Sequence, residues 1–568
     1  VDDYATYVRD LEKRIEAGQD VAIELLTGAE LLSSAAKRAS GTASSALASL
    51  AQQLGDAHLE IGVRIDIALS SEAASLAREH PDPRTVTRYD RSLAVDVDPV
   101  IARFGAWYEF FPRSTGPADR HGTFDDAHER LEYVASLGFD VVYLPPIHPI
   151  GRTARKGRNN SLVTEPGDPG SPWAIGAREG GHKAIHPSLG TFEDFERFRR
   201  HAESLGLRIA LDVAFQTSPD HPYVTEHPEW FRHRPDGTIR YAENPPKKYE
   251  DIYPFDFGTE AFHSLWEELA SVFFFWIDRG VRIFRVDNPH TKSLRFWEWC
   301  IAEVKARHPD IVFLSEAFTR PKLMYALAKL GFSQSYTYFT WRVTKNEIET
   351  YMHELTRTEV AEHFRPSFWP NTPDILPSHL VTGGRGAFAA RAVLASMLSS
   401  TYGVYGPPFE LMEHVPRPGT EEYVDNEKYQ LRSWHTEDPR SLAPLLARLN
   451  RIRRAHPALH DNRSLRFHRV ENEQLLSFSK RSDDRRDVIL VFVNLDPHHT
   501  QAGFVDLDLG ELGVAHDEAF HVEDLLSGAR YEWRGTRSFI ELDPTSMPAH
   551  VFRVDHASRN ETSFEYYL

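Results

Sequence analysis

Four successive segments of this sequence repeat one pattern: a helix-like stretch, a helix stop and then a short apolar run. They read EYVASLGFDVVYLPPIHP, FERFRRHAESLGLRIALDVAF, AFHSLWEELASVFFFWIDRGVRIFRVD and LRFWEWCIAEVKARHPDIVFLSEAF. Helices that alternate with strands in this way require the strands to pair in parallel. Four such units in a row favour a closed (β/α)₈ TIM barrel over an open sheet.

The remaining sequence predicts one domain on each side of this α/β barrel. Residues 1–82 are rich in Ala, Leu, Glu and Ser without strand alternation, which predicts a helical bundle. The barrel is expected over residues 83–460. Residues 461–568 contain short alternating runs such as QLLSFSKR and VILVFVNL, which predict a C-terminal antiparallel β-sandwich domain.

Two long excursions rich in Pro and Gly interrupt the barrel where strands end. They cover about residues 151–187 and 217–254. Loops of this length in a compact domain are usually functional. We therefore expect two loop subdomains that form the walls of a cleft.

Charge and cysteine content exclude some classes of partner. The formal net charge of −18 argues against general binding to nucleic acid or to an anionic membrane. The single cysteine, Cys300, rules out an internal disulfide and suits a reducing cytoplasm. The sequence shows no signal peptide and contains no apolar run of the roughly 20 residues that span a bilayer. We expect a cytoplasmic protein without membrane segments.

Two of the apolar runs end on carboxylates. GVRIFRVDN carries Arg285 and Asp287, two positions apart and so on one face of a strand, and VFLSEAF carries Glu316. An adjacent guanidinium keeps a carboxylate ionised, as a nucleophile requires. Two carboxyls on neighbouring barrel strands could flank one bond, which is the minimum equipment for glycosyl transfer with retention. The alternative interpretation is a structural Arg–Asp pair and an unrelated Glu.

Four short blocks in this order resemble the α-amylase superfamily of retaining glycoside hydrolases and transglycosylases. They are ALDVAF, RIFRVDN, FLSEAF and WPNTPD. Two positions differ from the superfamily pattern: Gln216 stands where His is common after the strand-3 block, and Thr372-Pro373 replaces the His of the strand-7 triplet. These two differences argue against an ordinary amylase.

A narrower set of motifs is similar to the bacterial α-1,4-glucan:maltose-1-phosphate maltosyltransferase family. The motifs are GAWYEFFPRS, LPPIHPIG, KGRNNSL, GGHKAIHPSLGTFEDF, NPPKKYEDIYP and DNEKY, and the resemblance runs from about residue 100 to the end. It implies transfer of maltosyl units from α-maltose 1-phosphate to the non-reducing 4-hydroxyl of an α-1,4-glucan, with Asp287 as nucleophile, Glu316 as general acid/base and Asp374 as transition-state stabiliser. The family also has an N-terminal β-domain, for which this sequence has no counterpart.

The same resemblance implies a set of substrate-binding residues. Lys247 and Tyr249, with Asn288, are expected around the phosphate, while a solvated pair is the alternative for Lys247-Lys248. The full expected set is Lys156, Asn160, Gln216, Lys247, Tyr249, Asp251, Arg285, Asn288, Lys428 and Tyr429.

No cofactor or metal is expected. His148, His182 and His186 lie among Pro and Gly without the spacing of metal ligands, so sugar contacts or loop packing are the preferred interpretation. We expect a homodimer as well. Two alternatives stay open: another retaining α-glucan enzyme, either a hydrolase or a trehalose synthase, and a non-catalytic sugar-binding protein with an amylase-like barrel.

Overall fold

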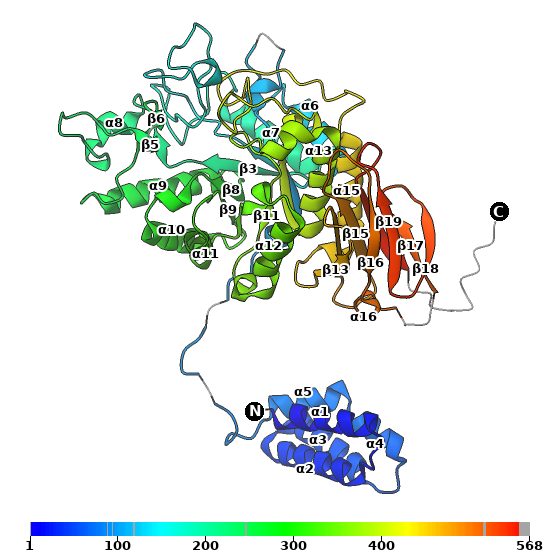
Figure 1. Ribbon diagram of the computed structural model, residues 1–568. Coiled ribbons are helices and arrows are strands. Elements are labelled where there is room, and N and C mark those ends of the chain that lie inside the picture. Colours follow the sequence, from blue (N-terminus) through cyan, green and yellow to red (C-terminus); the bar gives the residue numbers. More distant parts are fainter. Residues whose placement is uncertain are drawn as a thin grey trace. The chain divides into compact units, whose positions relative to one another are not determined.

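The structure is a computed structural model that describes residues 2–87, 89–93, 95–117, 120–244, 247–514 and 519–555 (Figure 1). The side chains of Asn244 and Lys247 lie outside the described part. The chain divides into two compact units, residues 1–95 and 96–568.

The first unit is helical. Apolar side chains at helical spacing, such as Leu25, Leu32, Leu47 and Leu54, are fully buried and form its core. Asp2 caps the first helix, because its Oδ1 accepts a hydrogen bond from the backbone N–H of Ala5. The helices in the described residues are α1 (Asp3–Glu16), α2 (Ala22–Arg38), α3 (Gly41–Gly55), α4 (Ile61–Ala68) and α5 (Ser71–Glu79).

The second unit contains a parallel barrel. Its described strands pair in the order β10-β9-β8-β3-β2-β1-β12-β11, and every pairing is parallel. A parallel bridge between Ser335 and Pro366 joins the two end strands and closes the barrel. The strands are β1 (Gly105–Glu109), β2 (Val141–Leu144), β3 (Arg208–Val213), β8 (Ile283–Val286), β9 (Val312–Ser315), β10 (Gln334–Ser335), β11 (Ser367–Phe368) and β12 (Thr401–Tyr405).

Large aromatic side chains fill the inside of the barrel. Trp107, Tyr143, Tyr336 and Trp369 belong to one buried cluster, and the rings of Tyr336 and Trp369 stack with centroids 4.8 Å apart. The same cluster includes the aliphatic side chains of Val141, Ile283, Val312 and Leu314, and alternation along the strands turns the residues between them outward against helices. The barrel interior is therefore packed with side chains and is not an open channel.

Helices surround the barrel, and several begin at residues suited to cap them. Thr191 and Asp194 form a capping box at the start of α7, and Thr344 and Glu347 form another at α12. The α-helices are α6 (His128–Ser136), α7 (Phe192–Ser204), α8 (Pro222–Glu226), α9 (Phe262–Ile277), α10 (Leu294–Arg307), α11 (Pro321–Lys329), α12 (Lys345–Arg357), α13 (Ser378–Leu398), α14 (Gly406–Glu410) and α15 (Ala443–Ala455). Short 3₁₀ turns are η1 (Val100–Ala102), η2 (Pro112–Ser114), η3 (Arg158–Asn160), η4 (Pro228–Trp230), η5 (Pro289–Thr291), η6 (Tyr338–Trp341), η7 (Glu359–Glu362) and η8 (Pro457–Leu459).

Both excursions return to the point at which they leave the barrel. The first closes on itself through an antiparallel bridge between Ile150 and Ile175. The second is closed by antiparallel pairing of β4 (Gln216–Thr217) with β7 (Tyr253–Pro254). Within it, β5 (Ala242–Asn244) and β6 (Lys247–Tyr249) pair as an antiparallel ribbon.

The chain after the barrel forms an antiparallel sheet, coloured orange to red in Figure 1. Gly386 of α13 allows that helix to approach the sheet domain, because an added Cβ would lie 2.8 Å from the carbonyl oxygen of Pro497. The described strands are β13 (Arg466–Val470), β14 (Leu475–Arg481), β15 (Val488–Asn494), β16 (Gln501–Asp506), β17 (Ala519–Asp524), β18 (Arg530–Arg534), β19 (Arg537–Leu542) and β20 (Ala549–Asp555), with α16 (Leu509–Leu512) between β16 and β17. The predicted fold class, an α/β barrel with a helical N-terminal region and a C-terminal antiparallel β-domain, is confirmed.

In the described part of the chain, no helix has both the length and the apolar character needed to cross a membrane.

Candidate functional site

Three carboxyl groups lie at the carboxyl end of the barrel. Asp287 directly follows β8, Glu316 directly follows β9, and Asp374 lies in the segment after β11. Asp287 and Glu316 are buried, whereas Asp374 is partly exposed. Parallel strands present their carboxyl ends at one edge, so residues far apart in sequence meet there.

Arg285 connects the carboxyl groups of three neighbouring strands. Its Nη1 lies 2.8 Å from Asp212 Oδ2 and 2.9 Å from Asp287 Oδ1, and its Nη2 lies 2.6 Å from Glu316 Oε1. Tyr143 donates a further hydrogen bond of 2.5 Å from its hydroxyl to Asp212. A rigid planar guanidinium fixes the two carboxyls of Asp287 and Glu316 relative to one another.

The same burial acts differently on the pKa values of the three acids around Arg285. Burial alone would raise the pKa of Asp287, but the charges of Arg285 and Lys292 outweigh it and lower that pKa. Burial raises the pKa of Glu316 to about 8, against the opposing effect of Arg285. Burial also raises the pKa of Asp212, to about 7. Asp287 is thus held ionised while Glu316 can carry a proton near neutral pH, which is the division of roles that retaining glycosyl transfer requires.

Asn288 contacts the oxygens of Asp287 and Glu316 that Arg285 leaves free. Its backbone N–H donates to Glu316 Oε2 at 3.3 Å, and its side-chain amide donates to Asp287 Oδ2 at 3.3 Å. These contacts depend on a left-handed backbone with φ 42° and ψ 52°, which asparagine tolerates better than most residues.

Asp374 is held by Lys428, which comes from a distant loop. Lys428 Nζ lies 2.6 Å from Asp374 Oδ1 and 5.0 Å from the ring centroid of Trp173. Asn371, in the same WPNTPD block, is buried and bonds to the end of β12 through Tyr405. Asn371 therefore anchors the segment that carries Asp374.

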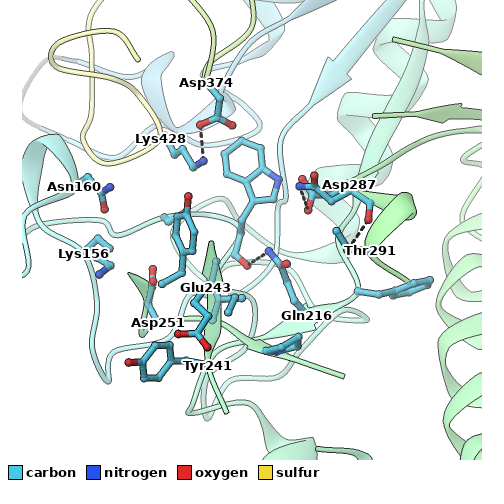
Figure 2. A pocket seen from close by; sticks show the side chains of 18 of the residues that line it. Lys156, Asn160, Gln216, Tyr241, Glu243, Asp251, Asp287, Thr291, Asp374 and Lys428 are labelled. Atoms are coloured by element: carbon cyan, nitrogen blue, oxygen red, sulfur yellow. Dashed lines mark hydrogen bonds and ion pairs between the residues drawn. The ribbon is translucent and has the colours of Figure 1, made fainter. Parts of the chain in front are cut away.

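A cavity of about 1190 Å³ opens above these carboxyls. Figure 2 shows Lys428 beside Asp374, with Lys156 and Asn160 across the view from Asp287. Most of the residues predicted from sequence line it: Lys156, Asn160, Gln216, Tyr249, Asp251, Asp287, Asn288, Asp374, Lys428 and Tyr429. Arg285 and Glu316 are not among the lining residues, and the Lys247 side chain lies outside the described part.

The wall of the cavity carries polar groups that are held in place. Lys156 is 3% exposed, and its Nζ lies 2.8 Å from Glu250 Oε2. Gln216 donates from its side-chain amide to the carbonyl of Trp173 at 3.2 Å. Burial raises the pKa of Asp251, whose Oδ1 is buried without a hydrogen-bond partner among the described residues.

Several lining residues were not predicted from the sequence. Trp173 and Ser171 come from the first excursion, where GSPW gives no chemical signal of its own. The Ser171 hydroxyl is buried and has no partner in the described part of the chain, so it is available to a bound ligand. Lys292 also lines the cavity. The sequence signal that could have predicted this is its position five residues after Asp287.

The predicted histidines pack in the loops. His182 Nε2 lies 2.9 Å from the Ala214 carbonyl, and His182 Nδ1 lies 3.2 Å from His221 Nε2. His148 Nδ1 lies 2.9 Å from the Ala184 carbonyl. His186 sits against His121 with the two rings stacked at 5.0 Å.

A closed parallel barrel with acids clustered around an arginine at its carboxyl end defines a protein of the α-amylase type. Solved structures agree with this fold: a maltogenic α-amylase, AmyB, from Thermotoga neapolitana superposes with a TM-score of 0.64 at 19% identity over 81% of this chain and 100% of that one. An α-amylase from Lactobacillus plantarum gives 0.60 at 20% identity over 80% and 100%. Residues 109–278 match the profile of the α-amylase catalytic domain.

The chain belongs to the α-1,4-glucan:maltose-1-phosphate maltosyltransferase family. Residues 1–99 match the profile of domain N/S of that enzyme, and residues 467–554 match the profile described as GLGE, C-terminal. Curated relatives with this name include the proteins of Chlorobaculum tepidum, 50% identical over 98% of this chain and 84% of that protein, and Salinibacter ruber, 51% identical over 99% and 85%. The predicted resemblance is confirmed.

Proposed function

We propose that this enzyme transfers maltosyl units from α-maltose 1-phosphate to the non-reducing 4-hydroxyl of α-1,4-glucans and releases phosphate. Membership of the family supports the substrates. The observation that carries the mechanism is the shared contact of Asp287 and Glu316 with Arg285 at the base of a large cavity. Carboxyls that cooperate in retention are about 5–5.5 Å apart, a separation that one bridging guanidinium suits.

In the first step, an oxygen of Asp287 attacks the anomeric carbon and forms a β-maltosyl ester. The bond from that carbon to the phosphate oxygen breaks, and Glu316 gives its proton to the departing phosphate. The lowered pKa of Asp287 and the raised pKa of Glu316 favour these assignments.

In the second step, the acceptor 4-hydroxyl attacks the same carbon and loses its proton to Glu316. The ester bond breaks and the Asp287 carboxylate is restored. Two inversions give net retention and a new α-1,4 bond. Asp374, held by Lys428, is assigned to the hydroxyls of the donor sugar next to the reacting carbon.

The phosphate group is assigned to Lys247, Tyr249 and Asn288. β6 brings Tyr249 to the cavity, and Asn288 stands beside the nucleophile. The sugar hydroxyls are assigned to Lys156, Asn160, Gln216, Asp251 and Lys428, and Tyr429 is assigned to the face of a sugar ring. Arg285 acts through Asp287 and Glu316, two of the three acids that it binds.

One experiment separates this proposal from its alternatives. Purified protein with α-maltose 1-phosphate and glycogen should release inorganic phosphate in step with chain growth. Phosphate release with free maltose instead of chain growth indicates a hydrolase. Conversion of maltose to trehalose indicates an isomerase, and binding without turnover indicates a non-catalytic sugar-binding protein.

The proposal includes a cytoplasmic homodimer. The single cysteine is buried and burial raises its pKa, so the thiol is inert and compatible with a reducing compartment. Light scattering should give a molar mass twice that of one chain, and a value for a single chain would contradict the dimer.

A further inference from the structure

A fifth acid lies inside the barrel beneath the site. Glu109 is the last residue of β1 and shares its inward face with Trp107, two residues earlier. Its register partners are Tyr143 on β2 and Tyr405 on β12. The residue is 1% exposed and does not line the cavity.

Glu109 has no ionic or hydrogen-bonding partner within the described ranges. Both of its carboxyl oxygens are buried and unpaired. The cation whose charge opposes the rise in the pKa of Glu109 is Arg285. Its Nη atoms are already engaged by Asp212, Asp287 and Glu316, and its Nε is buried without a hydrogen-bond partner among the described residues. A buried carboxylate that lacks a partner is strongly unfavourable, so the group takes up a proton instead. Burial accordingly raises the pKa of Glu109 well above its usual range.

The neighbouring acids disfavour a negative charge on Glu109. Arg285 contacts Asp212, Asp287 and Glu316, and the fields of Asp212 and Glu316 add to burial in raising the pKa of Glu109. The other titratable groups whose fields reach Glu109 are Asp374, opposed by Lys428, and the hydroxyls of four buried tyrosines: Tyr143, Tyr336, Tyr405 and Tyr423. A further negative charge here would compete with Asp287 and Glu316 for Arg285.

We propose that Glu109 is a positioning residue for the transfer reaction, a neutral carboxylic acid that supports Arg285 from inside the barrel. Its carbonyl dipole stabilises the guanidinium without the full charge that would draw it away from Asp287 and Glu316. A hydrocarbon side chain would give no such support, and a carboxylate would compete for the cation. This inference rests on the proposed function.

Two substitutions test it by kinetics. Glu109→Gln keeps the shape and the carbonyl dipole and stays neutral, so kcat should remain within about threefold of the unaltered enzyme. Glu109→Leu removes the dipole, so kcat should fall at least about tenfold with little change in KM for α-maltose 1-phosphate. A Leu variant within threefold of the unaltered enzyme, or a Gln variant as impaired as Leu, would overturn the proposal.

The pH profile tests the protonation state separately. If Glu109 is neutral, Glu109→Gln leaves the alkaline limb of kcat in place. If Glu109 were ionised, its removal would lower the pKa of Glu316 and move that limb to lower pH by about one unit, which contradicts the proposal.

An infrared difference spectrum between the unaltered enzyme and Glu109→Gln at neutral pH needs no turnover. It should show loss of the C=O band of a protonated acid, and loss of carboxylate bands would overturn the proposal. This measurement stands even if the Leu variant does not fold. If the unaltered enzyme released no phosphate, the proposed function would be refuted. The infrared spectrum would still test whether Glu109 is protonated.

Discussion

Arg285 Nη2 lies 2.6 Å from Glu316 Oε1, so the acid with the raised pKa is bound to the same guanidinium that holds the nucleophile ionised. Arg285 sits between the rings of Tyr143 and Tyr336, with Cζ 5.6 and 5.8 Å from their centroids. Because these rings confine the guanidinium of Arg285, it cannot move toward Asp287 without changing its contact with Glu316. The two acids therefore respond to pH and to substitution as a coupled pair.

The first prediction concerns the nucleophile. Asp287→Asn should lower kcat by at least about a thousandfold, because an amide cannot form the ester intermediate. Phosphate release from α-maltose 1-phosphate with glycogen measures this. Asp483→Asn, at an exposed position in the turn after β14, is the matched control and should leave kcat unchanged. Activity retained in Asp287→Asn would refute the assignment.

The second prediction concerns trapping of the intermediate. Glu316→Ala lacks the base for the second step, whereas a maltosyl fluoride needs no acid to lose its leaving group. This variant should therefore accumulate a maltosyl adduct on Asp287. Mass spectrometry of proteolytic peptides locates the added mass, and an adduct on another residue would contradict the proposed roles.

The third prediction concerns pH. Glu316 must be protonated in the first step, and its pKa is raised to about 8. The rate of phosphate release should accordingly be sustained at neutral pH and decline as the pH rises through about 8. Initial rates between pH 4 and pH 10 give the midpoint. A midpoint near the ordinary pKa of a glutamic acid would show that burial does not control this group.

The fourth prediction concerns Asp374 and Lys428. Loss of either charge leaves the other misplaced, so Asp374→Asn and Lys428→Met should each lower kcat/KM by roughly a hundredfold or more. The double variant should lose much less than the product of the two single losses, because the residues act as one unit. Multiplicative losses in this cycle would mean that the 2.6 Å contact has no role in turnover.

The fifth prediction separates two properties of Asn288. Its left-handed backbone is natural for glycine and unfavourable for alanine by about 1–2 kcal/mol. Asn288→Gly should keep the free energy of unfolding close to that of the unaltered protein, and Asn288→Ala should lower it by about 1 kcal/mol. Both variants should lose activity, because both lack the amide that contacts Asp287. Urea denaturation and phosphate release measure the two effects.

The sequence predicted those parts of the fold that depend on local patterns. The runs ending in Asp287 and Glu316 are apolar enough to identify buried strands, and strand order places their ends side by side. β10 and β11 have two residues each and no comparable apolar run, so only the closed barrel identifies them. Their pairing depends on neighbouring strands, not on their own composition.

Contacts across long separations limited what could be predicted of the site. The Lys428–Asp374 pair joins residues 54 positions apart, and the carbonyl of Trp173 reaches Gln216 over 43 positions. The family resemblance implied that Lys428 and Gln216 bind substrate but gave no partner within the protein for either. The sequence did not predict the position of Glu109. An acid at the end of a barrel strand is usually catalytic or exposed, whereas Glu109 is buried, has no partner in the described part of the chain and does not line the cavity.

The pairing of β4 with β7 has a consequence for how the cleft can change. The chain leaves the barrel at Gln216–Thr217 and returns at Tyr253–Pro254, and these two short strands pair with each other. The two ends of the intervening segment are therefore held at a fixed position on the barrel. We expect that changes of length in the parts of this segment away from Tyr249 and Asp251 leave β3 and β8 in place. Evolution and engineering can therefore alter which chains this barrel accepts while its acids stay in register.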